Sequence, residues 1–188
     1  MRWRTGTDPW PPPVRAVLFD RDGTLVHDVP YNGDPALVRP VDGARQVLDE
    51  IRASGTMVGM VTNQSGIGRG LLDANQVRAV NERVNELLGP FDTVQVCPHA
   101  PGDGCLCRKP GPGLVLRAAA DLGLMPHECA VVGDIGADVD AALAAGARGV
   151  LVPTPETRTE EVDAAGTVAE DLWQAVDLAL GAPREVTA

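Results

Sequence analysis

Short apolar runs alternate along this chain with segments whose apolar residues recur at helical spacing, and this alternation limits the possible folds more than any other feature. The runs end at polar or turn-forming residues and predict buried parallel strands at 14–19, 57–61, 93–96, 129–132 and 149–152, with a very short one at 167–169. The intervening segments predict helices at 41–54, 73–88, 113–122, 139–145 and 170–180. We therefore expect an α/β fold, a Rossmann-like, doubly wound and mainly parallel sheet with helices on both faces.

The chain length of 188 residues suits one domain with a hydrophobic core of its own. Residues 1–13 end in three prolines and are expected to form an irregular lead-in, with a single domain over 14–188. The polar stretch 153–166 carries no predicted helix or strand and is expected to be mobile.

Composition excludes several classes of function. The chain has 26 acidic and 16 basic residues and only 3% aromatic residues, which argues against a nucleic-acid-binding surface. No stretch approaches the ~20 apolar residues of a membrane span, and the N-terminus lacks the apolar core of a signal peptide. We expect a monomeric cytoplasmic protein with reduced thiols that binds neither nucleic acid nor membrane.

Acidic pairs follow two of the predicted strands, at the sheet edge where α/β proteins bind ligands. Asp20 and Asp22 emerge from the first strand, where one carboxylate can attack or bind metal while the other moves a proton. Taken alone, the pair Asp22-Gly23 fits an ordinary turn equally well. Asp134 and Asp138 follow a later strand and, alone, would more often cap a helix. Together the two acidic strand ends predict an oxygen-lined magnesium site with a phosphate as a further ligand.

A carboxylate that approaches a phosphoryl group needs nearby donors and cations to offset the repulsion. Thr62 and Asn63 end the second predicted strand, and Lys109 precedes a predicted helix. A lone lysine is more often a solvated surface charge, so Lys109 is a candidate site residue only because the acidic pairs are also present.

Three of the four cysteines lie within eleven positions and form, with one histidine, the pattern C-x-H-x5-C-x-C. Three thiolates and an imidazole suit tetrahedral zinc with no open position, which indicates a structural site. The alternatives are a disulfide or unrelated loop thiols. Zinc would order the loop that leads into Arg108 and Lys109, and Cys129 is expected to be a buried core thiol. The predicted zinc ligands are Cys97, His99, Cys105 and Cys107.

The order of these motifs resembles the haloacid dehalogenase superfamily of aspartate-nucleophile phosphohydrolases. The matching residues are Asp20-x-Asp22-Gly-Thr, Thr62, Lys109 and Gly133-Asp134-x-x-x-Asp138. The resemblance implies that Asp20 is the nucleophile that forms an aspartyl-phosphate and that Asp22 is the general acid/base. It also implies that Thr62 and Lys109 hold the phosphate. Magnesium would be bound by Asp134, Asp20 and the backbone carbonyl of Asp22, with Asp138 supporting the site less directly.

The sequence of the cysteine loop and the sequences around Thr62 and Lys109 resemble those of one branch, the D-glycero-D-manno-heptose-1,7-bisphosphate 7-phosphatases and related histidinol-phosphate phosphatases. This resemblance implies that Asn63 and Arg108 contact substrate. It also implies that Gln64, Ser65 and Arg69 line the mouth. The chain departs from the branch in two places: its cysteine loop is short, and Ile135 stands where a basic residue is common. Both departures affect the substrate-facing side.

The expected function is magnesium-dependent hydrolysis of a small sugar phosphate, with the 7-phosphate of heptose 1,7-bisphosphate as the first candidate. Histidinol phosphate or another small phosphomonoester is the alternative substrate. Two other functions stay open: an inactive zinc-stabilised binding module and a phosphotransferase. The short segments after Asp22 and Thr62 leave no room for a large cap domain, so the site should be open to a small phosphorylated metabolite and to water.

Overall fold

The computed structural model describes residues 13–181 and contains a five-stranded sheet in the order β3-β2-β1-β4-β5. All four strand pairings are parallel, which confirms the predicted doubly wound architecture. Residues 1–12 of the expected lead-in lie outside the described residues. The strands are β1 (Ala16–Phe19), β2 (Met57–Asn63), β3 (Thr93–Cys97), β4 (Cys129–Gly133) and β5 (Arg148–Leu151).

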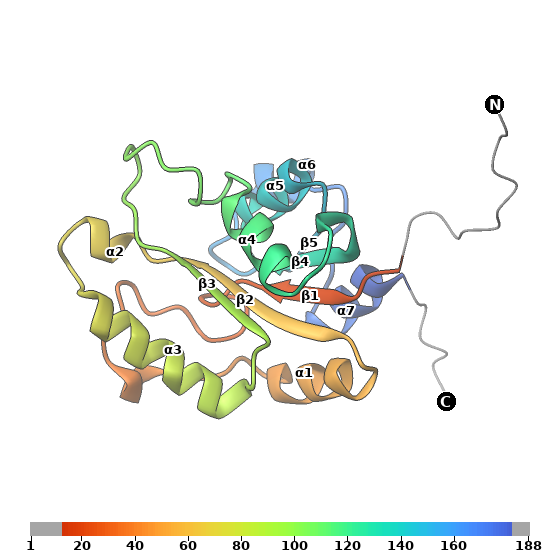
Figure 1. Cartoon of the computed structure of the whole chain (residues 1–188), viewed down its shortest axis with the longest axis horizontal. Coiled ribbons are helices and arrows are strands. Elements are labelled where there is room, and N and C mark those ends of the chain that lie inside the picture. The colour runs from red at the N-terminus through yellow and green to blue at the C-terminus, as the bar shows by residue number, and fades with distance from the viewer. Residues whose placement is uncertain (1–12, 182–188) are drawn as a thin grey trace, which may run out of the picture.

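Helices cover both faces of the sheet (Figure 1). Helices α1, α3 and α7 pack on one face, and α4 and α5 pack on the other. None of the helices within 13–181 has the length and apolar character needed to cross a membrane. The helices are α1 (Ala44–Ala53), α2 (Ser65–Gly68), α3 (Ala74–Leu88), α4 (Gly113–Asp121), α5 (Gly136–Ala145), α6 (Thr159–Ala164) and α7 (Leu172–Leu180), with 3-10 turns at Pro35–Leu37 and Pro126–Glu128.

The central strand β1 shows why the apolar runs predict the sheet. Val17 and Phe19 face the layer of α1, α3 and α7, whereas Ala16 and Leu18 face the layer of α4 and α5. All four side chains are fully buried, as expected for a strand covered on both faces. The strand therefore has no solvent face that would call for alternating polar residues.

The structure differs from the sequence-based expectation in a few local elements. Helix α5 begins at Gly136, three residues earlier than expected, because the Asp138 carboxylate accepts a hydrogen bond from the Ile135 N–H and starts the first turn. Helix α6 lies within the polar stretch expected to be mobile. The expected strand at 167–169 is reduced to a bridge between Val168 and Leu151.

The strand order places two acidic strand ends beside each other. The chain runs outward from β1 through β2 to β3, then crosses back so that β4 pairs with the other side of β1. The carboxyl ends of β1 and β4 meet at this switch point, with Asp20 and Asp134 directly after them. Between the strands and the helices that follow, the described chain carries loops, 3-10 turns and the short helix α2, and no cap domain.

Candidate active site

Three buried carboxylates meet at the switch point. Asp20 follows β1, Asp134 follows β4, and Asp138 lies in the first turn of α5. One oxygen of each lies within 4.8 Å of the others. Burial raises the pKa of Asp20 to about 7, with Lys109 opposing the rise and Asp138 and Asp22 adding to it. Burial and repulsion from Asp138 likewise raise the pKa of Asp134 to about 7. Three carboxylates thus lie together with Lys109 as their ammonium partner, and their oxygen donors fit a hard divalent cation.

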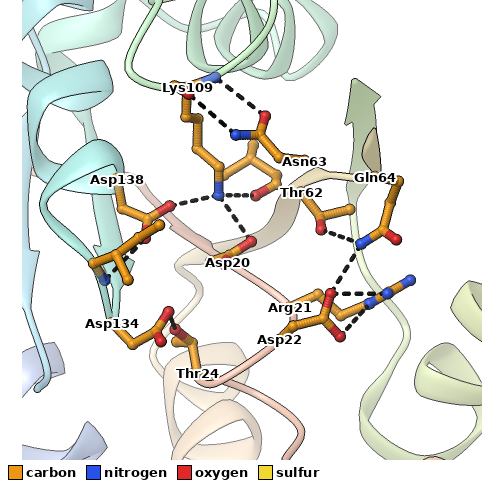
Figure 2. A network of polar contacts seen from close by, with 12 residues as sticks. Asp20, Arg21, Asp22, Thr24, Thr62, Asn63, Gln64, Lys109, Asp134 and Asp138 are labelled. Atoms are coloured by element: carbon orange, nitrogen blue, oxygen red, sulfur yellow. Dashed lines mark hydrogen bonds and ion pairs between the residues drawn. The ribbon is translucent and has the colours of Figure 1, made fainter. Parts of the chain in front are cut away.

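Lys109 supplies the one ammonium group in direct contact with this cluster among the described residues (Figure 2). Its Nζ lies 2.8 Å from Asp20 Oδ1 and 2.5 Å from Asp138 Oδ1, and it donates a hydrogen bond of 2.9 Å to the Val61 carbonyl. Burial acts against the charged form, but Asp138 and Asp20 outweigh it and raise the pKa of Lys109. Lys109 is therefore a fixed cation rather than a mobile surface lysine.

The Asn63 amide holds the Lys109 backbone. Asn63 Oδ1 accepts a hydrogen bond of 3.1 Å from the Lys109 N–H, and its Nδ2 donates one of 3.2 Å to the Lys109 carbonyl. This pairing joins the end of β2 to the segment before α4. Asn63 also lines the site cavity, where the sequence predicts that it contacts substrate.

Two glycines allow the carboxylates to approach so closely. Gly23 has φ +78° and faces Asp134, so that a methyl group there would overlap the Asp134 carboxylate. Gly133 stands in the same relation to the Asp138 side chain. The turn after β1 thus requires glycine both for its left-handed conformation and for space.

Asp22 is held away from this cluster by three hydrogen bonds. Arg21 donates from Nε to Asp22 Oδ1 at 3.0 Å and from Nη2 to Oδ2 at 2.8 Å. Gln64 Nε2 donates to Asp22 Oδ2 at 2.9 Å and to the Thr62 hydroxyl at the same distance. Figure 2 shows Asp22, Arg21 and Gln64 on one side of Asp20, opposite Asp138.

Sequence reasoning missed several polar side chains of this site, among them Arg21 and Thr24. Arg21 was assigned no role from sequence, yet its side chain is only 1% exposed. Thr24 donates a hydrogen bond of 3.3 Å to Asp134 Oδ1, and its place in the Asp-x-Asp-Gly-Thr motif was the available signal.

A cavity of about 400 Å³ brings most of the predicted site residues together. Two predicted residues do not line it: Asp138 is fully buried, and Arg69 lies over the ring of Tyr31, with its guanidinium 5.9 Å from the ring centre. Asp28 and Glu156 also line the cavity and were not predicted from sequence. Ile135 also lines it, and the predicted site residues that do so are Asp20, Asp22, Thr62, Asn63, Gln64, Ser65, Arg108, Lys109 and Asp134.

The four predicted zinc ligands also lie together. Their ligand atoms are all within 4.8 Å of one another, with Cys97 and Cys107 buried and His99 and Cys105 partly buried. All four cysteines of the chain are free, so the disulfide alternative is wrong. Burial and hydrogen bonding to Cys107 raise the pKa of the Cys97 thiol to about 12. Such clustered thiols need a soft cation to be held as thiolates, and the set fits tetrahedral zinc.

Comparison with known proteins places this fold and site in a class. Residues 106–175 match a family model described as HAD-hydrolase-like. A relative from Pasteurella multocida is 35% identical over 158 residues, which are 78% of this chain and 86% of the relative. The chain belongs to the HAD-like hydrolases and is a phosphoric monoester hydrolase.

The relatives define the branch more narrowly. The protein from Pasteurella multocida and one from Pseudomonas putida, 32% identical over 75% of this chain and 83% of its own length, are both named D-glycero-beta-D-manno-heptose-1,7-bisphosphate 7-phosphatase. A solved structure from Bordetella bronchiseptica, D,D-heptose 1,7-bisphosphate phosphatase complexed with magnesium and phosphate, superimposes with a TM-score of 0.78. It is 29% identical, and the match covers 89% of this chain and 99% of that one. The resemblance stated from the motifs is confirmed.

Proposed function

We propose that this phosphatase hydrolyses a small sugar phosphate through an aspartyl-phosphate on Asp20, with magnesium bound beside it, and that its substrate is D-glycero-D-manno-heptose 1,7-bisphosphate, cleaved at the 7-phosphate. The observation that carries the proposal is the contact of Lys109 with Asp20 at a cavity that is also lined by Asp22, Thr62 and Asp134. The names of the relatives support it, as do the magnesium and phosphate with which the Bordetella protein is complexed.

Magnesium would be held by Asp20, Asp134 and the backbone carbonyl of Asp22. Burial raises the pKa of the Asp20 and Asp134 carboxyls, and a bound cation would favour their ionised forms. When bound, the cation neutralises phosphate oxygens and so lowers the repulsion that the carboxylate nucleophile meets. Asp138 contributes through Lys109, since it fixes the ammonium 2.5 Å away.

The reaction then needs two steps. A carboxylate oxygen of Asp20 attacks phosphorus, the bond from phosphorus to the sugar oxygen breaks, and Asp22 gives its proton to that oxygen. Water loses a proton to Asp22 and attacks the aspartyl-phosphate, which releases phosphate and restores the Asp20 carboxylate. Lys109 and the Thr62 hydroxyl stabilise the phosphate oxygens in both steps.

The same chemistry could serve a second substrate, histidinol phosphate. Asp28 and Glu156 line the cavity, and their carboxylates accept hydrogen bonds from sugar hydroxyls but also attract an amino group. The two substrates therefore need to be compared directly.

The loop over 97–107 would hold a structural zinc ion through its three thiolates and one imidazole. Elemental analysis of protein purified without chelator should find close to one zinc per chain. A zinc content far below one ion per chain would contradict this assignment.

The test of function is magnesium-dependent phosphate release from both anomers of heptose 1,7-bisphosphate, beside histidinol phosphate. We expect kcat/KM to favour the heptose by a hundredfold or more, about 2.7 kcal/mol of transition-state discrimination. Asp20→Asn should abolish turnover, whereas Asp140→Asn, an exposed change on α5, should leave it intact.

Other outcomes point to the alternatives. Weak, indiscriminate turnover would keep the phosphatase and reject the heptose. A fall in the amount of free phosphate released when an acceptor alcohol is added would indicate a phosphotransferase. No turnover of any phosphomonoester would indicate a binding module.

A further inference from the structure

Arg21 is the largest fully buried side chain among the described residues, although it stands between two aspartates in sequence. A buried guanidinium is stable only when its donors are paired. Nε and Nη2 form a fork on the two oxygens of Asp22, and Nη1 donates a hydrogen bond of 2.7 Å to Asn81 Oδ1. All three nitrogens therefore have partners, divided between the site and helix α3.

Asn81 lies in the middle of α3, sixty residues further along the chain. This helix is a firm support, because Asp73 and Gln76 close its first turn with a capping box, and Val77, Val80 and Val84 are buried. The Asp22 side chain is partly exposed and by itself would sample several rotamers. The chain of contacts from α3 through Asn81 and Arg21 removes that freedom.

An apolar side chain would fill the space of Arg21 with a smaller desolvation cost. What the guanidinium adds is direction, since its planar fork fits both carboxylate oxygens in one orientation. Lysine has a single nitrogen and cannot form the fork and reach Asn81 together.

We propose that Arg21, anchored by Asn81, is a positioning residue that orients Asp22 for proton transfer. The inference rests on the proposed role of Asp22 as general acid/base. Misplacing an acid by a fraction of its hydrogen-bond length slows proton transfer to a poor leaving group and leaves a good leaving group largely unaffected.

The test uses enzyme in excess over substrate, so that only the departure of the leaving group is followed. The substrates are heptose 1,7-bisphosphate, or whichever alkyl phosphate the unmodified protein hydrolyses fastest, and p-nitrophenyl phosphate, whose leaving group departs without a proton. Asn81→Ala should lower the rate with the alkyl phosphate by about 10- to 100-fold and the rate with the aryl phosphate by less than about threefold. In separate steady-state assays, KM for the alkyl phosphate should change by less than about threefold, since Asn81 does not line the site cavity.

Three variants complete the design. Asn81→Asp keeps the acceptor for Nη1 and should retain the rate with the alkyl phosphate. Arg21→Lys keeps the charge without the fork and should behave like Asn81→Ala. Asn75→Ala, an exposed asparagine on the same helix, is the matched control and should match the unmodified protein.

Equal losses of Asn81→Ala on both substrates would show a merely structural role and overturn the proposal, as would unchanged rates on both. Asn81 is only partly buried, so its alanine variant should fold. If it does not, Arg21→Lys decides by the same comparison of substrates. Failure of the proposed function is distinct, because the unmodified protein would then hydrolyse neither substrate.

Discussion

Removing the proposed zinc ion from the loop over 97–107 should weaken substrate binding more than it slows the chemical steps. Lys109 does not depend on the loop for its position, because Asp20, Asp138 and the Val61 carbonyl hold its ammonium, and Asn63 holds its backbone. Arg108, one residue earlier, has a buried Nη1 with no hydrogen-bond partner among the described residues. Loss of order in the loop should therefore displace Arg108 first.

The size of the effect follows from the contact that Arg108 would make with substrate. A hydrogen bond from a charged donor contributes about 1.5–3 kcal/mol. Losing it lowers kcat/KM by roughly 10- to 150-fold, at about 1.36 kcal/mol per factor of ten. We expect most of this loss in KM, with kcat within about threefold, because the groups on the reacting phosphate keep their contacts.

The assay combines zinc content with steady-state kinetics of Cys105→Ala at saturating magnesium. Cys129→Ala on β4 is the matched control, since this thiol is buried outside the cluster. A fall in kcat of a hundredfold at constant KM would refute the reasoning, because the loop would then be needed to place Lys109. Unchanged kinetics in zinc-free Cys105→Ala would refute it from the other side.

Two further predictions concern the carboxylate cluster. Burial raises the pKa of the Asp20 and Asp134 carboxyls from 3.8 to about 7. Between these values the folded state binds more protons than the unfolded state, so the free energy of unfolding in magnesium-free buffer should fall as the pH rises from about 4 to 7. In thermal unfolding, Tm should fall less with rising pH for Asp134→Asn than for the unmodified protein. Addition of magnesium at pH above 7 should restore the Tm of the unmodified protein. An equal fall of Tm in the variant would contradict the assignment. Gly23→Ala and Gly55→Ala both place alanine at positive φ, at a cost of about 1–2 kcal/mol each. Only Gly23→Ala should also lose phosphatase activity, because nothing lies within 4 Å of the added carbon at Gly55; equal activity in the two variants would argue against close approach at Gly23.

The sheet could be predicted because buried parallel strands have one dominant requirement, continuous apolar residues, and β1, β2 and β4 meet it. Helix α3 was equally readable, since Asp73 caps it and its apolar residues keep one face. Helices α2 and α6 gave no such signal. The first is four residues long and holds two glycines, and the second has no buried residue, so neither displays a core-facing pattern.

The same reasoning separates the parts of the site that could be predicted from those that could not. Asp20, Asp22 and Asp134 follow apolar runs directly, and the topology then brings their strand ends together. The pairing of Arg21 with Asn81 has no local signal, because an arginine between aspartates usually faces solvent and its partner is sixty residues away. Contacts between distant polar residues depend on three-dimensional packing that periodicity does not encode.

The close approach of Gly23 to Asp134 means that two motifs distant in sequence cannot change independently. A side chain at position 23 would need the space of the Asp134 carboxylate, and a shorter residue at 134 would lose its carboxylate oxygens. The same dependence links Gly133 with Asp138. Substitutions at the glycines should therefore be tolerated only in related chains that have also lost the carboxylates, so the glycines indicate whether a related chain keeps the proposed cation site.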